Sequence, residues 1–341
     1  MESILIGSKS EILIGRGLPD PLLPPNPDRR RVVVVTQPGA RAVAERAVEA
    51  AASAGDEVSL LLMPDRDEAK SLMAVERAYH HLAEFGLGRH DTVMAVGGGA
   101  VTDSGGFIAA TWMRGVDLVH VPTTLLAAID AAIGGKTAVN LAGKNLVGVF
   151  WHPRRIVIDL DVIASLPDEL KSEGAAEAIK AGLLAAPEIV DAYLEKGLEA
   201  DLELVVPAAV RVKAEVVSRD FREAGERALL NLGHTIGHGI EFAAGISHGR
   251  AVAIGLVAAA TVSERLCDFQ ETTTVVDALE AAGLPTRAPK VDRHSVLTLV
   301  ERDKKRTAEG TRMVLLEGIG RPVLRHVTDE DLTAGLVAVG L

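Results

Sequence analysis

The chain has one cysteine, few aromatic residues and no long apolar run, and these scarcities exclude several classes of protein. A single cysteine, Cys267, among 341 residues excludes an internal disulfide framework and is typical of a reducing cytoplasm. No uninterrupted apolar stretch reaches about 18 residues, so we expect no membrane span. The N-terminus has no basic region followed by an apolar run, so we expect no signal peptide.

Basic charge is also scarce. The 36 Lys and Arg residues are outnumbered by 47 Asp and Glu residues, which gives a formal net charge of −11. This balance argues against nucleic acid or an anionic membrane as the main partner. An anionic small molecule would therefore need a local cluster of Lys and Arg. Aromatic residues make up only 3% of a chain that is 48% hydrophobic, so the core must consist of Ala, Val, Leu and Ile, which suits helices packed on a parallel sheet.

The length favours two domains, and the pattern along the chain changes near its middle. Apolar strand-like runs at 32–35, 58–63, 92–96, 117–121 and 156–160 alternate with helical segments at 39–54, 68–85 and from 102 onward. Such alternation predicts crossover units and a parallel sheet covered on both faces. Later segments at 172–186, 202–218, 228–244, 250–269 and 272–282 are helical in pattern, and 311–316 with 322–326 predicts a hairpin. We therefore predict an α/β domain over 1–160 and a mostly helical domain over 161–341, with the proline-rich stretch 19–27 as a surface loop just before the sheet.

A triple glycine, Gly97 to Gly99, lies between a predicted strand and a predicted helix. Backbone N–H groups and a helix N-terminus converge there, which favours a phosphate or pyrophosphate site. The pattern is not the usual dinucleotide fingerprint, because Thr102 and then Asp103 stand where the third glycine is expected. A tight turn alone is the alternative. Thr123 and Thr124 end the next strand, where ligands of parallel sheets gather.

A second cluster combines Asp130, Lys136, Lys144 and Asn145 in a glycine-rich, apolar context. Lys136 stands among Ala, Ile and Gly, where a surface lysine is not expected. With Arg114, these donors favour an anion site, since phosphate recognition needs converging cationic and amide groups. Two solvated lysines on loops are the alternative.

The segment 226–250 contains His234, His238 and His248 in a small-residue background. Histidines four residues apart leave the same face of a helix, so His234 and His238 suit ligation of a metal such as zinc. Glu177 and Lys180 are three residues apart on another predicted helix. Alone they favour an ion pair on the helix surface, but beside the histidines Glu177 becomes a candidate third ligand, because two histidines and a glutamate with an open position form a catalytic zinc pattern.

These residues lie in blocks that resemble one family nearly over the full length. The blocks are GGGAVTDSGGFIAATWMRG, VPTTLLAAIDAAIGGKTAVN, GKNLVGVFWHP, EAIKAG, VKAEVV, RALLNLGHTIGHGIE, HGRAVAIGL and DKK. In kind and order they resemble the 3-dehydroquinate synthases, which are sugar phosphate cyclases. The resemblance implies an N-terminal Rossmann-like domain that binds NAD, a helical C-terminal domain that holds a divalent metal, zinc or cobalt, and a homodimer in the cytoplasm.

The resemblance also implies roles for individual residues. It implies metal ligation by Glu177, His234 and His248, in place of the pairing of His234 with His238, and it puts His238 in the substrate pocket. Implied cofactor contacts are Asp65, Asp67, Lys70, Gly97, Gly98, Gly99, Ala100, Val101, Thr102, Asp103, Thr123, Thr124, Lys136, Lys144, Val162, Ile163, Ala164 and Ser165. Implied substrate contacts are Arg114, Asp130, Lys136, Asn145, Lys180, Lys213, Arg227, Asn231, His238 and the pair Lys304 and Lys305, between which the pattern does not choose. One departure is Thr36-Gln37-Pro38, which stands where many members have an acid near the adenosine ribose.

The implied reaction converts 3-deoxy-D-arabino-heptulosonate 7-phosphate into 3-dehydroquinate and phosphate, a step of the shikimate pathway of aromatic amino acid biosynthesis. NAD⁺ is regenerated in each turnover. Two rival enzymes are a cyclase of secondary metabolism and a metal-dependent dehydrogenase of the glycerol dehydrogenase type, which would release NADH. A nucleotide-binding regulator without chemistry is a third alternative.

Overall fold

The computed structural model describes residues 1–25, 29–223, 225–302, 306–307 and 310–341. The chain forms two compact units, Met1–Leu166 and Pro167–Leu341, called here the first and second units. None of the described helices combines the length and the apolar character that crossing a membrane requires. Lys304 and Lys305, expected to contact substrate, lie outside the described residues.

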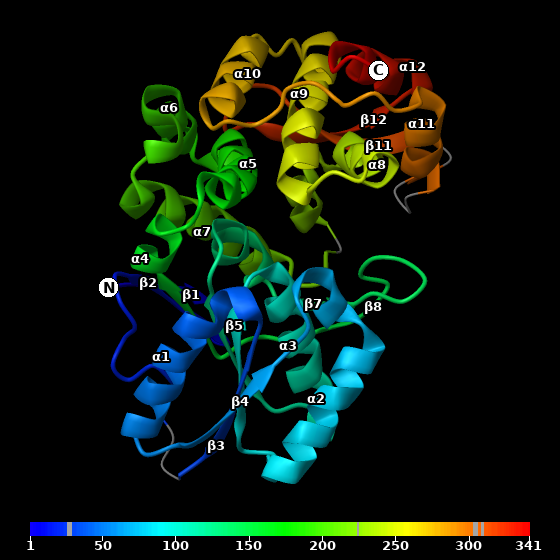
Figure 1. The fold of residues 1–341 in the computed structure, drawn as a ribbon. Helices are drawn as coiled ribbons and strands as arrows, with labels where there is room; N and C mark the ends of the chain where they lie inside the picture. Colours follow the sequence, from blue (N-terminus) through cyan, green and yellow to red (C-terminus); the bar gives the residue numbers. More distant parts are fainter. Residues whose placement is uncertain (26–28, 224, 303–305, 308–309) are drawn as a thin grey trace. The chain divides into compact units, whose positions relative to one another are not determined.

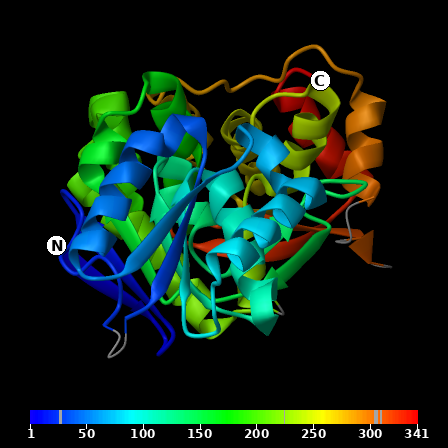
Figure 2. The same cartoon turned by 60° about the horizontal axis from the view of Figure 1, so that its bottom comes forward.

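The first unit is built on a seven-stranded sheet with the order β1-β2-β9-β6-β5-β3-β4. All neighbouring strands are parallel except β1 and β2, which form an antiparallel hairpin at one edge (Figure 2). The strands are β1 (Glu2–Ile6), β2 (Ser10–Gly15), β3 (Arg31–Thr36), β4 (Glu57–Leu62), β5 (Thr92–Gly97), β6 (Asp117–Pro122) and β9 (Arg155–Asp159). A separate hairpin pairs β7 (Lys136–Val139) with β8 (Val147–Phe150). The helices are α1 (Arg41–Ser53), α2 (Leu72–Phe85), α3 (Gly99–Thr111) and the short α4 (Leu160–Ala164).

Both faces of the sheet are covered by helices, as the sequence predicts (Figure 1). Side chains alternate between faces along a strand, so Val32 and Val34 pack with one cluster while Val33 and Val35 pack with the other. The first cluster includes the alanines of α1, and the second includes the apolar faces of α2 and α3. Small residues allow these helices to approach closely: a Cβ at Gly105 would lie 2.7 Å from the Cβ of Ala95.

The strand order creates a switch point between β3 and β5. The chain runs from β3 outward to β4 and then returns to β5 on the other side of β3. The connection that follows β3 and the connection that follows β5 therefore lead in opposite directions along the sheet. Ligands of such sheets bind at the carboxyl ends of the strands where the direction changes. Gln37 follows β3, and Gly98 follows β5, so both lie at this point.

Two hairpins of the first unit were not predicted from the sequence. β1 and β2 precede the stretch 19–27, so the prediction that the sheet begins just after this stretch is wrong. The β7–β8 hairpin lies in the glycine-rich region where only a cluster of polar residues was expected. Both hairpins contain short strands of 4 to 6 residues, too short to show a clear period.

The second unit is mostly helical, as predicted. Its central helix, α9, packs against α5, α8 and α12. The antiparallel strands β11 and β12 pair Thr311 with Val327 and Leu316 with Pro322, which confirms the predicted hairpin. The elements are α5 (Asp168–Ala185), α6 (Pro187–Lys196), α7 (Leu202–Arg219), α8 (His234–Ala244), α9 (His248–Cys267), α10 (Thr272–Ala281), α11 (Arg293–Arg302), β10 (Arg306–Thr307), β11 (Gly310–Leu316), β12 (Pro322–Val327) and α12 (Asp329–Ala338).

The predicted continuous helix over 228–244 is wrong. A 3₁₀ segment, Glu226–Asn231, ends before Gly233, which has a φ of 77° and breaks the helical path. Glycine adopts this left-handed conformation at little cost. The break makes His234 the first residue of α8.

Candidate functional site

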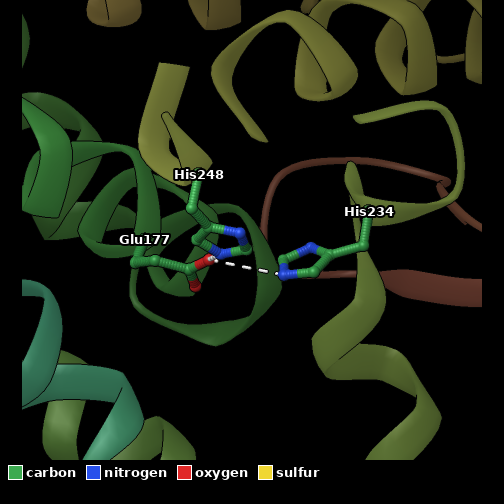
Figure 3. A group of neighbouring side chains, drawn as sticks. All are labelled: Glu177, His234 and His248. Carbon is green, nitrogen blue, oxygen red and sulfur yellow. Dashed lines mark hydrogen bonds and ion pairs between the residues drawn. The ribbon is translucent and has the colours of Figure 1, made fainter. Parts of the chain in front are cut away.

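Three side chains from separate helices converge in the second unit: Glu177 of α5, His234 of α8 and His248 of α9 (Figure 3). Glu177 Oε1 lies 3.4 Å from His234 Nε2 and 3.2 Å from His248 Nε2. One oxygen and two nitrogens, all within 4.8 Å of one another, form a group that is able to hold a metal ion. These are the ligands that the family resemblance implies.

Close helix packing brings the three residues together. A Cβ at Gly249 would lie 2.2 Å from Glu173 O, so glycine allows the start of α9 to approach α5. A Cβ at Gly255 would lie 1.9 Å from Gly233 O, so glycine also allows α9 to approach the start of α8. The first contact places His248 next to α5, and the second fixes the position of His234.

Glu177 is buried and its carboxylate is shared among three cationic or polar neighbours. Lys180 forms an ion pair with Oε2, while Oε1 faces the two histidines. Burial would raise the pKa of Glu177, but the Lys180 charge and the hydrogen bond with His248 hold this pKa well below its usual range. Glu177 and Lys180 therefore do form an ion pair, but the alternative of a pair on the helix surface is wrong, because the two residues are only 2% and 4% exposed.

The two histidines differ in protonation. Burial and the nearby charge of Lys180 hold the pKa of His234 well below its usual value, so its ring is neutral near pH 7. His234 Nδ1 lies 3.0 Å from Leu232 O, and a proton there leaves Nε2 with a lone pair directed toward Glu177. Burial would lower the pKa of His248, but its hydrogen bonds to Glu177 and Glu241 raise it to about 10.

His238 lies beside this group, but no group of potential metal ligands contains both His238 and His234 among the described residues. The two rings are 5.0 Å apart between centroids and meet edge to face. His238 instead belongs with Glu241 and His248 to a second group of potential metal ligands. The spacing of four residues predicted correctly that His234 and His238 share a region of one helix, but the pairing of these two as ligands is not the arrangement found.

Glu241 was not predicted from the sequence. It is buried on α8, and its Oε2 lies 3.1 Å from His248 Nδ1. A signal was present, because Glu241 follows His238 by three residues and therefore shares its face of the helix.

Of the other predicted substrate residues of the second unit, Arg227 and Lys213 are buried and Asn231 is partly buried. The guanidinium of Arg227 donates to Phe221 O, and its backbone N–H donates to Asp220. Asn231 Nδ2 donates to Glu223 Oε1 at 2.9 Å. Lys213 is buried on α7. Arg227 and Asn231 are thus held by the loop that follows α7.

The glycine turn of the first unit lies where the sequence places it. Gly97 ends β5 and accepts a hydrogen bond from Thr123 N, while a Cβ at Gly98 would lie 3.3 Å from Thr124. Both threonines therefore adjoin the turn. The prediction that the helix begins at Thr102 is wrong. The helix begins at Gly99, so its first turn lies within the segment 99–103.

Lys70 connects the glycine-turn helix to the β7–β8 hairpin. Its Nζ lies 2.6 Å from Asp103 Oδ2 on α3 and is also bonded to Asn145 Oδ1. Lys70 O accepts from Asn140 N, and Asn140 Oδ1 in turn accepts from Asn145 N. Two implied cofactor residues, Lys70 and Asp103, are therefore in one network with the implied substrate residue Asn145.

Arg114 and Lys136 lie on segments joined by Trp151. The ring of Trp151 covers Gly115, where a Cβ would lie 2.2 Å away, and the backbone N–H of Trp151 donates to Gly135 O. Both cationic side chains are exposed, so the expectation that Lys136 is withdrawn from the surface is wrong.

The remaining candidates of the first unit lie on short turns and helix ends. Lys144 is exposed on the β7–β8 connection, and Asp130 lies in a π-helical turn, Ala127–Ala131, a distortion that is frequent at functional sites. Asp65 and Asp67 are exposed after β4. The stretch expected as a turn, Val162, Ile163, Ala164 and Ser165, largely forms α4, and the first two of these side chains are buried.

The fold and the cluster of two histidines and a glutamate define the chain as a member of the sugar phosphate cyclase superfamily. A crystal structure of 2-deoxy-scyllo-inosose synthase is 26% identical, covers 100% of both chains and has a TM-score of 0.87. The 2-epi-5-epi-valiolone synthase of Streptomyces hygroscopicus subsp. jinggangensis is 25% identical over 99% of both chains, with a TM-score of 0.87. A probable glycerol dehydrogenase from Sinorhizobium meliloti 1021, 18% identical with a TM-score of 0.59, shares the fold alone.

The sequence comparisons assign the family within this superfamily. Residues 60–173 match the 3-dehydroquinate synthase N-terminal model, and residues 174–306 match the C-terminal model. The 3-dehydroquinate synthase of Corynebacterium pseudotuberculosis (strain C231) is 40% identical over 88% of this chain and 86% of the relative. That of Paenarthrobacter aurescens (strain TC1) is 38% identical over 96% and 93%. The chain belongs to the 3-dehydroquinate synthase family, which confirms the predicted enzyme activity.

Proposed function

We propose that the enzyme converts 3-deoxy-D-arabino-heptulosonate 7-phosphate into 3-dehydroquinate and phosphate, with NAD held by the first unit and a divalent cation held by Glu177, His234 and His248. The convergence of these three ligand atoms within 4.8 Å carries the proposal. Two solved relatives support it, since one was determined with NAD⁺ and Co²⁺ and the other with NAD⁺ and Zn²⁺.

The donor set fits a divalent cation with an open position for substrate. Two imidazole nitrogens and one carboxylate oxygen are a common catalytic set for zinc. Lys180 occupies Glu177 Oε2, so only Oε1 is directed toward the histidines and the carboxylate would bind through one oxygen. When bound, the cation supplies a Lewis acid that polarises a substrate oxygen. The three residues would hold the cation in place, and the burial of Glu177 limits competition from water for the cation.

The first unit offers a site for the dinucleotide at its switch point. The turn at Gly97 to Gly99 opens α3, so backbone N–H groups and the positive end of the helix face one place, which suits a pyrophosphate. NAD supplies a hydride acceptor that is restored within each turnover. Thr123 and Thr124 adjoin the turn and provide hydroxyl groups for the same ligand.

The cationic residues account for an anionic substrate of an acidic protein. We propose that Arg114, Lys136 and Asn145 hold the phosphate of the substrate, and that Lys213 and Arg227 hold its carboxylate. Guanidinium and ammonium donors bind such groups by charge-assisted hydrogen bonds. Arg227→Ala should raise KM or lower kcat, and an unchanged value of both would refute the assignment to the carboxylate.

The proposal includes a homodimer in the cytoplasm, with 1–160 as the NAD-binding domain and 161–341 as the metal-binding and substrate-binding domain. Support for the dimer comes from the family resemblance. Light scattering on the purified protein tests it, and a mass equal to one chain at micromolar concentration would overturn it.

The decisive experiment measures phosphate release from the heptulosonate phosphate by the zinc-loaded protein with catalytic NAD⁺, and identifies the product by mass. We expect equal amounts of phosphate and dehydroquinate, no accumulated NADH, and loss of activity with a chelator. Glu177→Gln should remove the metal-dependent activity. No turnover of this substrate, with turnover of sedoheptulose 7-phosphate, would assign the protein to a secondary-metabolite cyclase instead.

A further inference from the structure

The imidazole of His248 lies between two carboxylates. Its Nε2 lies 3.2 Å from Glu177 Oε1, and its Nδ1 lies 3.1 Å from Glu241 Oε2. Glu177 comes from α5 and Glu241 from α8, so the ring on α9 is held from two neighbouring helices. Glu241 is 8% exposed, which places this contact in the interior of the unit.

The chemistry of a ligating histidine decides the role of the second carboxylate. A neutral imidazole carries a proton on one nitrogen and a lone pair on the other. If Nε2 of His248 gives its lone pair to a cation, Nδ1 carries the proton and donates it to Glu241, which only accepts. Such a contact fixes the tautomer and the ring orientation and raises the basicity of the ligand.

The other histidine is held in a different way. His234 Nδ1 faces Leu232 O at 3.0 Å, a neutral acceptor on its own chain segment. Both Nε2 atoms face Glu177, but at Nδ1 only His248 has a carboxylate partner among the interactions described for the two rings. Since α8 provides both His234 and Glu241, one helix would supply a ligand and also orient the ligand of α9.

We propose that Glu241 is a positioning residue of the metal centre, which holds His248 Nδ1 and strengthens His248 as a ligand through Nε2. This inference rests on the proposed cation site of Glu177, His234 and His248. In the alternative group of His238, Glu241 and His248, the His248 nitrogen that lies next to Glu241 is Nδ1. A neutral ring cannot give lone pairs from both nitrogens, so filling the first group through Nε2 leaves Nδ1 as a donor.

The test measures Zn²⁺ and Co²⁺ affinity of the full chain by competition with a chromogenic chelator. Glu241→Gln keeps the size and one weaker acceptor, and it should reduce affinity about 10-fold. Glu241→Leu removes the acceptor and should reduce affinity about 100-fold. Both variants should bind one ion per chain and alter the visible spectrum of the Co²⁺ form, a change that loss of folding stability alone would not produce. The kcat should fall while the KM for the sugar phosphate stays near the wild-type value.

Glu173→Gln is the matched control. The Glu173 carboxylate binds Ser247 Oγ and Gly249 N, the residues on either side of His248, without a described bond to its ring. The Glu173→Gln substitution also removes one negative charge near the start of α9, and its metal affinity should equal that of the wild type.

The outcomes separate this inference from the proposed function. Wild-type protein that binds neither ion would refute the metal site itself. Wild-type binding with equal affinity in both Glu241 variants would refute the positioning role alone. Two ions per wild-type chain and one in Glu241→Gln, with the tighter affinity unchanged, would make Glu241 a ligand of a second site and overturn the proposal.

Discussion

Replacing Gly255 by alanine should damage the candidate metal centre from outside it. Gly255 lies on α9 where this helix crosses the start of α8, and a Cβ there would lie 1.9 Å from Gly233 O and 2.9 Å from Gly237 N. Non-bonded heavy atoms prefer a separation of about 3.5 Å or more. The two backbones would therefore have to separate by roughly 1.6 Å, and His234 follows Gly233 directly.

The magnitude follows from this displacement. Inserting one methyl group into a packed interior costs about 1–3 kcal/mol and sometimes more, and contact with backbone atoms favours the upper end, about 3 kcal/mol. A displacement of about 1 Å at a catalytic group can reduce the rate about 100-fold. For Gly255→Ala we therefore expect a free energy of unfolding lower by about 3 kcal/mol, weaker Zn²⁺ binding and a kcat/KM lower by about 100-fold.

Urea denaturation, chelator competition and steady-state kinetics measure these three quantities. Gly245→Ala is the control, because a Cβ there would meet nothing within 4 Å, although the φ of 63° carries a conformational cost of about 1 kcal/mol. Its metal affinity and kcat/KM should equal those of the wild type. Wild-type metal affinity and kcat/KM in Gly255→Ala would refute the argument that this crossing positions His234.

Three further substitutions each test one buried polar side chain. His120 is buried, its Nδ1 has no hydrogen-bond partner among the described residues, and burial lowers its pKa from 6.5 to about 3. As pH falls below 6.5, this histidine therefore gains a proton in the unfolded chain but not in the folded one. The free energy of unfolding should fall by about 2 kcal/mol between neutral pH and pH 5, and urea titrations of His120→Leu should not show this decrease. Lys180→Met leaves the Glu177 carboxylate buried without its ammonium partner and should cost about 3–5 kcal/mol in urea, part of which added Zn²⁺ should restore; a stability equal to the wild type would contradict this. Gln37→Glu replaces the two N–H donors directed at Pro64 O and Arg66 O by a carboxylate that faces the same carbonyl oxygens. We expect the free energy of unfolding in urea to fall by about 2 kcal/mol. A decrease of less than about 1 kcal/mol would contradict a stabilising role of these two hydrogen bonds.

Sequence patterns predicted the parts of the fold that depend on local order. The valines at 32–35 and the later β-branched runs predict buried parallel strands because each is apolar on both faces. Helices of the second half were predicted from their period. The break at Gly233 was missed because its φ depends on packing against Leu256, which is distant in sequence.

The site was predicted less completely because its geometry depends on contacts between distant helices. Glu177 and His248 are 71 residues apart, so spacing on one helix could not show that they meet. The burial of the Glu177 and Lys180 pair was missed for the same reason, since a separation of three residues is the same on a buried and an exposed face. Family resemblance supplied the ligand set that local spacing left open.

The contacts of Lys70 determine how the first unit would respond to ionic strength. Its ammonium is buried against the Asp103 carboxylate and the Asn145 amide, so its charge is compensated by the protein itself. In the proposed dinucleotide site, attraction of the phosphates would then depend mainly on oriented backbone dipoles at the start of α3, which act at short range. If the proposed roles hold, binding of the dinucleotide should depend little on salt, whereas capture of the sugar phosphate by the exposed Arg114 and Lys136 should weaken as salt is added.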